Sequence, residues 1–165
     1  TGFIPDILHS HDWQAALTTV YLKTIYANVP GFENVKAIFT IHNIEYQGKY
    51  DFNILGDVFA LPEKYRSIVE NDGCINLMKG AIAVADKVST VSPRYASEIL
   101  TEEYSHGLSG ILCANSYKLS GILNGIDYDY YNPETDKAYK DVFARADQAM
   151  YNNKEEMKKA LKNEQ

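Results

Sequence analysis

The run Val35-Lys-Ala-Ile-Phe-Thr-Ile41 constrains the fold more than any other part of this chain. It is nearly continuous in apolar residues, which is typical of a strand buried on both faces of a sheet. A shorter strand is predicted within Pro5–Asp12, and a helix follows it with Trp13 and Val20 on one face. A strand, a helix and a buried strand in this order predict a parallel sheet.

The later elements continue this alternation. Loops are expected at 28–34 and at 46–61, where Gly, Pro, Asn and Asp gather. Ser92-Pro93 is typical of a helix start, with serine as N-cap and proline at the first helical position. We therefore predict an α/β fold, a parallel Rossmann-like sheet flanked by helices. Its strands are expected near 6–9, 36–41, 88–91 and 119–123, and its helices after residue 12 and at 63–70, 74–85 and 92–100.

Polar side chains follow three of the apolar runs at the point where each ends. The clusters are His9-Ser-His-Asp12, His42-Asn43 and Asn124-Gly-Ile-Asp127. In open α/β sheets, ligands bind in the crevice beyond the carboxyl ends of the strands. The sequence therefore predicts a site for a polar ligand at that edge of the sheet.

The residues of these clusters also have ordinary structural explanations. His9 lies within a strand pattern and is interpreted as structural, whereas either reading suits His11. Asp12 is an N-cap candidate for the helix that follows, or an acceptor for ligand hydroxyls. His42 follows the largely apolar run that ends at Ile41 and leads into a loop, which favours a ligand contact. Elsewhere, Trp13 is expected to pack against the sheet and Lys79 to be solvated.

Composition and motifs exclude several classes of protein. The net charge of −6 argues against nucleic-acid binding, which needs a basic face. No run of about 18 apolar residues exists, so no membrane span is expected, and the first residues do not form a signal peptide. A cytoplasmic protein is therefore expected. Cys74 and Cys113 lack metal-ligand spacing and are expected to be free thiols.

Several motifs together resemble glycosyltransferase family 5, the bacterial glycogen and plant starch synthases. They are His9-Ser-His-Asp-Trp13, Phe39-Thr-Ile-His-Asn-Ile-Glu-Tyr-Gln-Gly48, Leu77-Met-Lys-Gly80, Ala85-Asp-Lys-Val-Ser-Thr-Val-Ser-Pro93, Leu119-Ser-Gly-Ile-Leu-Asn-Gly-Ile-Asp127 and Asn132-Pro-Glu-Thr-Asp136. The resemblance implies a GT-B enzyme of two Rossmann-like domains. Such enzymes move glucose from ADP-glucose or UDP-glucose to the nonreducing end of an α-1,4-glucan, with retention of configuration. It implies no metal and no cofactor.

The resemblance also implies roles for particular residues. The histidine that matches His42 contacts the transferred glucosyl unit, and the residues that match Asp12 and Asn124 lie in the same sugar pocket. We accordingly expect catalytic roles for His42 and Asp12. Substrate-binding roles are expected for the remaining candidates, which are His11, Asn43, Tyr46, Gln47 and Asn124.

This chain departs from the family pattern in several ways. Position 14, commonly histidine, is Gln14. The Lys-x-Gly-Gly-Leu loop that approaches the donor's phosphates and the C-terminal Rossmann domain have no match in the chain. We therefore expect a fragment of the N-terminal catalytic domain over 1–136 that is inactive alone. The alternatives are a noncatalytic sugar- or glucan-binding remnant and a piece with no independent function.

The family pattern stops near Asp141, and an atypical helical tail is expected over 137–165, with its helix at 141–161. Residues 141–154 are similar to the closing helix of GGDEF diguanylate cyclase domains, although no GGDEF motif occurs. A fused or rearranged reading frame and a coincidental amphipathic helix both account for this similarity. Neither implies cyclase activity.

Overall fold

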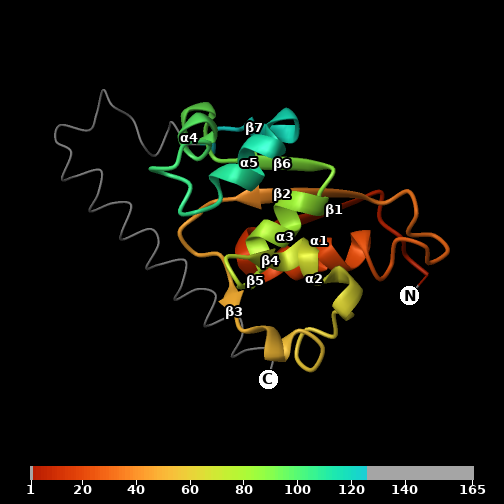
Figure 1. The fold of residues 1–165 in the computed structure, drawn as a ribbon. Helices are drawn as coiled ribbons and strands as arrows, with labels where there is room; N and C mark the ends of the chain where they lie inside the picture. Colours follow the sequence, from red (N-terminus) through yellow and green to blue (C-terminus); the bar gives the residue numbers. More distant parts are fainter. Residues whose placement is uncertain (1, 126–165) are drawn as a thin grey trace, which may run out of the picture. The chain divides into compact units, whose positions relative to one another are not determined.

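The computed structural model describes residues 2–125, and four of its strands form one parallel sheet. These strands lie in the order β1 (Ile7–His11), β2 (Lys36–Ile41), β6 (Lys87–Thr90) and β7 (Leu119–Gly121). Figure 1 shows them side by side. The predicted α/β architecture and its four parallel strands are confirmed.

One face of this sheet carries the hydrophobic core. Phe39 and Ile41 of β2 are fully buried, and they belong to the same cluster as Val20 of α1 (Asp12–Lys23) and Met78 of α3 (Leu77–Val84). The two helices pack closely enough that a methyl group added at Gly80 of α3 would lie 3.2 Å from a Val20 methyl of α1. Burial of this apolar face supplies the main driving force for folding.

The opposite face of the sheet carries polar side chains toward the carboxyl ends of its strands. The hydroxyls of Ser10 and Thr19 lie 2.6 Å apart, so Ser10 points toward α1. Side chains alternate along a strand, so His9 and His11 point to the other face. Thr40 lies beside His11 in the register, and Ser89 lies beside Thr40, so these two hydroxyls belong to the same polar face.

A small antiparallel sheet, which the sequence did not predict, lies beside the helices. It consists of β3 (Lys49–Tyr50), β5 (Cys74–Asn76) and β4 (Glu70–Asn71), with β5 in the centre. The predicted helix 74–85 is therefore wrong in its first turn. Asn76 ends β5 and caps α3, because its Oδ1 accepts a hydrogen bond from the Lys79 N–H at 2.9 Å. The predicted loop 46–61 contains β3 and the single turn η1 (Phe52–Ile54).

The remaining elements are short. The predicted helix 63–70 is divided into η2 (Glu63–Tyr65) and α2 (Arg66–Val69). The N-cap of α4 (Pro93–Glu98) is confirmed, because Ser92 Oγ accepts from the Tyr95 N–H at 2.9 Å. Helix α5 (Ser109–Ala114) and the turn η3 (Ser116–Lys118) were not predicted.

Two lysines hold helix ends by donating to backbone carbonyls. Lys118 is 5% exposed, and its ammonium donates to Ala83 O at 3.1 Å and Ala85 O at 2.8 Å, at the end of α3. Burial lowers the pKa of Lys118, and the charge of Asp86 opposes this shift. Lys79 donates to two carbonyls at the end of α2, so the prediction of a solvated lysine is wrong.

Residues 2–124 belong to one compact unit. The predicted domain boundary near residue 136, the helix 141–161 and Asp127 lie outside the described residues. Within the described part of the chain, no helix is both long and apolar enough to span a bilayer. Cys74 and Cys113 are both free, as predicted.

Candidate functional site

A pocket of about 190 Å³ lies on the polar face of the sheet, toward the carboxyl ends of its strands. Each of the four parallel strands, or the residues directly after it, contributes to the wall. The lining residues are His9, His11, Thr40, His42, Ser89, Thr90, Val91, Ile122 and Asn124. The structure thus brings together His11, His42 and Asn124, which the sequence predicted to converge.

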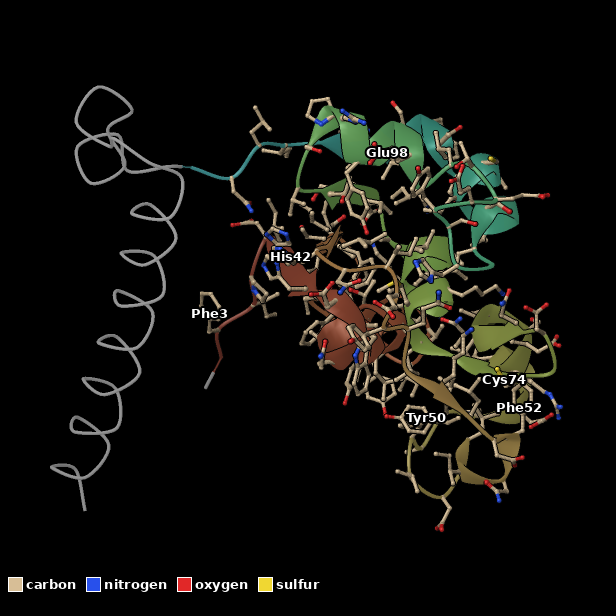
Figure 2. All side chains as sticks on the ribbon, turned by 90° about the vertical axis from the view of Figure 1, so that its left-hand side faces the viewer. Phe3, His42, Tyr50, Phe52, Cys74 and Glu98 are labelled. Carbon is tan, nitrogen blue, oxygen red and sulfur yellow. The ribbon has the colours of Figure 1, made fainter. Side chains whose placement is uncertain are left out.

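Two histidines from neighbouring strand ends are hydrogen-bonded inside this pocket. His11 Nδ1 and His42 Nε2 lie 2.9 Å apart, and the two ring centroids are 5.2 Å apart. Figure 2 shows His42 far from Tyr50, Phe52 and Cys74, which mark the small antiparallel sheet and its surroundings. The pair offers a ligand ring nitrogens that can donate or accept hydrogen bonds.

A chain of polar groups extends from His9 across the floor of the pocket. His9 Nε2 lies 2.7 Å from Thr40 Oγ1, which lies 2.7 Å from Ser89 Oγ. Desolvation, followed by the nearby rings of His11 and His42, lowers the pKa of His9. These influences favour the neutral form of His9, and its place in the wall makes it a pocket residue as well as a structural one.

The carboxylate of Asp12 anchors the turn after β2. Its Oδ1 accepts hydrogen bonds from the backbone N–H groups of His42 at 2.8 Å and Asn43 at 3.3 Å. The predicted N-cap role of Asp12 is wrong, because α1 begins at Asp12 itself and no side chain caps it. Asp12 has a left-handed backbone with φ of 53°. Such a conformation is uncommon outside glycine and is often found at functional sites.

The other predicted substrate-binding residues lie along the loop after His42. Asn43 Oδ1 accepts from the Glu45 N–H at 3.0 Å, so this side chain shapes the loop. Tyr46 is 60% exposed and borders a second hollow of about 330 Å³, formed by Trp13 and residues 45–50. Trp13 was expected to pack against the sheet. In the structure its ring packs against this loop, because a Cβ atom added at Gly48 would lie 2.7 Å from the ring.

Gln47 is 3% exposed and has its hydrogen-bonding groups occupied within the protein. Its amide nitrogen donates to Ile44 O and His106 O, each at 3.0 Å, and its oxygen accepts from the Asn76 side chain at 2.7 Å. This geometry favours a structural role that fixes the loop. A substrate contact by Gln47 stays a prediction.

The site residues that the sequence did not reveal are the hydroxyls of Thr40 and Ser89. Both lie within predicted strands and point to the same face of the sheet, which is the signal that could have identified them. Among residues 2–125, no cluster of three or more His, Cys, Asp or Glu side chains has the arrangement of a metal site. The polar groups that line the pocket are imidazole rings, hydroxyls and the Asn124 amide, and the Asp12 carboxylate binds the backbone N–H of His42 beside them.

Comparison with known proteins matches this chain to one family. The model of the starch synthase catalytic domain matches residues 1–114. The glycogen synthase of Clostridioides difficile is 45% identical over 161 residues, which cover 96% of this chain and 33% of that protein. The glycogen synthase of Ligilactobacillus salivarius is 48% identical over 138 residues, which cover 82% and 29%, respectively.

A solved structure gives the same result. The catalytic domain of starch synthase IV from Arabidopsis thaliana, bound to ADP and acarbose, is 39% identical with a TM-score of 0.69. The match covers 82% of this chain and 28% of that one. The chain thus spans about a third of the length of the relatives that it matches. By its sequence, its parallel sheet and its match to the family model, this chain belongs to the starch synthase catalytic domain family.

Proposed function

We propose that this chain supplies part of the sugar pocket of a retaining glucosyltransferase of glycogen or starch synthesis. The donor is ADP-glucose or UDP-glucose, and the acceptor is the nonreducing end of an α-1,4-glucan. The observation that carries the proposal is the convergence of His11, His42 and Asn124 in one pocket at the strand ends. Ligands of open α/β sheets bind at this position.

The pocket has the chemistry that this reaction needs. Transfer passes through an oxocarbenium-like transition state, which is stabilised by preoriented polar groups and by fixing the sugar hydroxyls. We assign to His42 a hydrogen bond to a hydroxyl of the transferred glucose, and to Asn124 a second polar contact. Asp12 Oδ1 accepts hydrogen bonds from the turn after β2. We therefore assign the contact with the sugar to Asp12 Oδ2.

The nucleotide and the glucan are assigned to other surfaces. The binding of ADP and acarbose by the Arabidopsis starch synthase IV domain supports a nucleotide-sugar donor and a glucan acceptor for this family member. We assign the diphosphate mainly to the second Rossmann-like domain of the complete enzyme. We assign the hollow bordered by Trp13 and Tyr46 to the side of this domain that faces the substrates in the complete enzyme.

A chimera tests this function. Residues 1–136 of this chain replace the matching segment of the Clostridioides difficile glycogen synthase, and glucan elongation from ADP-glucose is measured. We expect the chimera to transfer glucose. We expect His42→Ala in the chimera to lower kcat on the order of a hundredfold or more while ADP affinity is retained.

The control variant is His106→Asn, since His106 is exposed, does not line the pocket, and has a left-handed backbone that asparagine tolerates. It should leave kcat unchanged. Wild-type kcat in the His42→Ala chimera would contradict the assigned role. Binding of maltooligosaccharide by a chimera that transfers no glucose would favour the alternative of a noncatalytic sugar-binding remnant.

A further inference from the structure

The hydrogen bond between His11 and His42 couples the positions of the protons on the two rings. A bond between two ring nitrogens needs one donor and one acceptor, so the two neutral rings cannot choose their tautomers independently. No other side chain in the described part of the protein is hydrogen-bonded to either ring. Each ring is therefore the partner that sets the tautomer of the other.

The two possible directions of this bond are not equivalent. In water, the neutral histidine side chain carries its proton mainly on Nε2. If His42 Nε2–H donates to His11 Nδ1, both rings have this preferred tautomer. The reverse direction would require the proton on Nδ1 in both rings. The geometry therefore favours His42 as the donor and His11 as the acceptor.

The ring of His11 is itself held in place. Its centroid lies 4.2 Å from that of His9 with the planes tilted by 32°, so His11 lies between His9 and His42. His9 is fixed in turn by Thr40 Oγ1 at 2.7 Å. His11 thus has a defined position from which it can orient its neighbour.

We infer that His11 is a positioning residue that holds His42 in the Nε2–H tautomer. The Nδ1 lone pair of His42 is then available to accept a hydrogen bond from a substrate hydroxyl. The identification of that hydroxyl as one of a glucosyl unit rests on the proposed function. The tautomer itself is a property of this chain and does not depend on it.

Nitrogen NMR of the histidine rings tests this role directly. The 165-residue chain has four histidines, His9, His11, His42 and His106, so their ring signals can be assigned by substitution. The chain is labelled with 15N, and two-bond proton–nitrogen spectra are recorded at about pH 8.5, well above the ordinary histidine pKa. In the wild-type chain we expect His42 to show a protonated Nε2 and an unprotonated Nδ1.

Two variants separate the hydrogen bond from simple packing. His11→Phe keeps a ring against His9 but removes the hydrogen-bond acceptor. The ratio of the Nε2–H to the Nδ1–H tautomer of His42 should therefore fall by roughly two- to tenfold. His11→Asn offers Oδ1 close to the former position of Nδ1, and we expect it to restore the Nε2–H tautomer. The signals of His106, which does not line the pocket, should stay unchanged in both variants if the fold is intact.

Three results would overturn the inference. They are a predominantly Nδ1-protonated His42 in the wild-type chain, the same tautomer ratio in the wild-type and His11→Phe chains, and a folded His11→Asn chain without restoration. The first needs no variant, so a variant that fails to fold leaves the inference testable. No substrate is added, so an inactive chimera with a fixed His42 tautomer would refute the glucosyltransferase proposal alone.

Discussion

Gly121 lies where β7 passes the start of α4, and its replacement by alanine tests how tightly this end of the sheet is packed. The Cβ of an alanine at this position would lie 2.2 Å from Ser92 O, 2.3 Å from Ser92 C and 2.4 Å from Pro93 N. Ordinary contacts of a Cβ atom begin near 3.4 Å, so the two backbones would have to separate by about 1 Å. All three atoms are backbone atoms, and no side-chain rotation relieves the clash.

The cost can be estimated from two effects. Overpacking in a dense interior costs about 1–3 kcal/mol. Ile122 N donates to Thr90 O at 2.8 Å beside the clash, and weakening this bond adds about 0.5–1.5 kcal/mol. We therefore expect Gly121→Ala to lower the free energy of unfolding by about 1.5–4.5 kcal/mol, and the melting temperature by roughly 3–18 °C.

Urea unfolding followed by the fluorescence of Trp13, the single tryptophan, measures this change. The matched control is Gly110→Ala in α5, where an added Cβ meets no atom within 4 Å. Alanine favours a helix over glycine, so the control should be neutral or more stable by up to about 1 kcal/mol. If the two variants had equal stability, the close approach of β7 to α4 would be refuted.

Three further substitutions probe buried or paired polar groups. Lys118→Met leaves two carbonyls at the end of α3 without their donor, so unfolding in urea at pH 7 should show a loss of about 1–3 kcal/mol. Gln47→Leu leaves three internal partners unpaired and should cost at least as much as Lys118→Met, whereas a substitution at exposed Tyr46 should be nearly neutral. Burial, the largest influence on Asp86, raises its pKa, but the hydrogen bonds from Lys23 and a backbone N–H, with nearby lysine charges, lower it overall. Because the pKa of Asp86 in the folded protein lies below the ordinary 3.8, the stabilisation is present above pH 3.8 and is lost as the pH falls further. In Asp86→Asn, the free energy of unfolding should therefore depend less on pH in that range.

Much of the parallel sheet could be predicted because its strands are specified by local pattern. The apolar run ending at Ile41 and the Ser92-Pro93 helix start both coincide with elements of the structure. The small antiparallel sheet was missed because its strands have only two or three residues, too few to show alternation. Ile75 and Met78 also fit helical spacing, which concealed the change from β5 to α3 at Asn76.

The candidate site could be predicted in part. His42 and Asn124 followed from the rule that polar residues after buried strands converge at one edge of a parallel sheet. The bond from His42 N to Asp12 depends on the exact turn after β2 and on the left-handed backbone of Asp12, neither of which has a sequence signal. The contact of His11 with His42 depends on strand register, which only the three-dimensional structure supplies.

The assembly of the pocket from four strand ends has a consequence for how a ligand would affect this protein's motions. Its walls come from residues 9–11, 40–42, 89–91 and 122–124, so the detachment of any one strand removes part of the wall. A ligand present at 100 times its dissociation constant adds about 2.7 kcal/mol against every opening that destroys its site. Amide hydrogen exchange should then slow in all four strands together, including β7 at the edge of the sheet, and not only at the residues that touch the ligand.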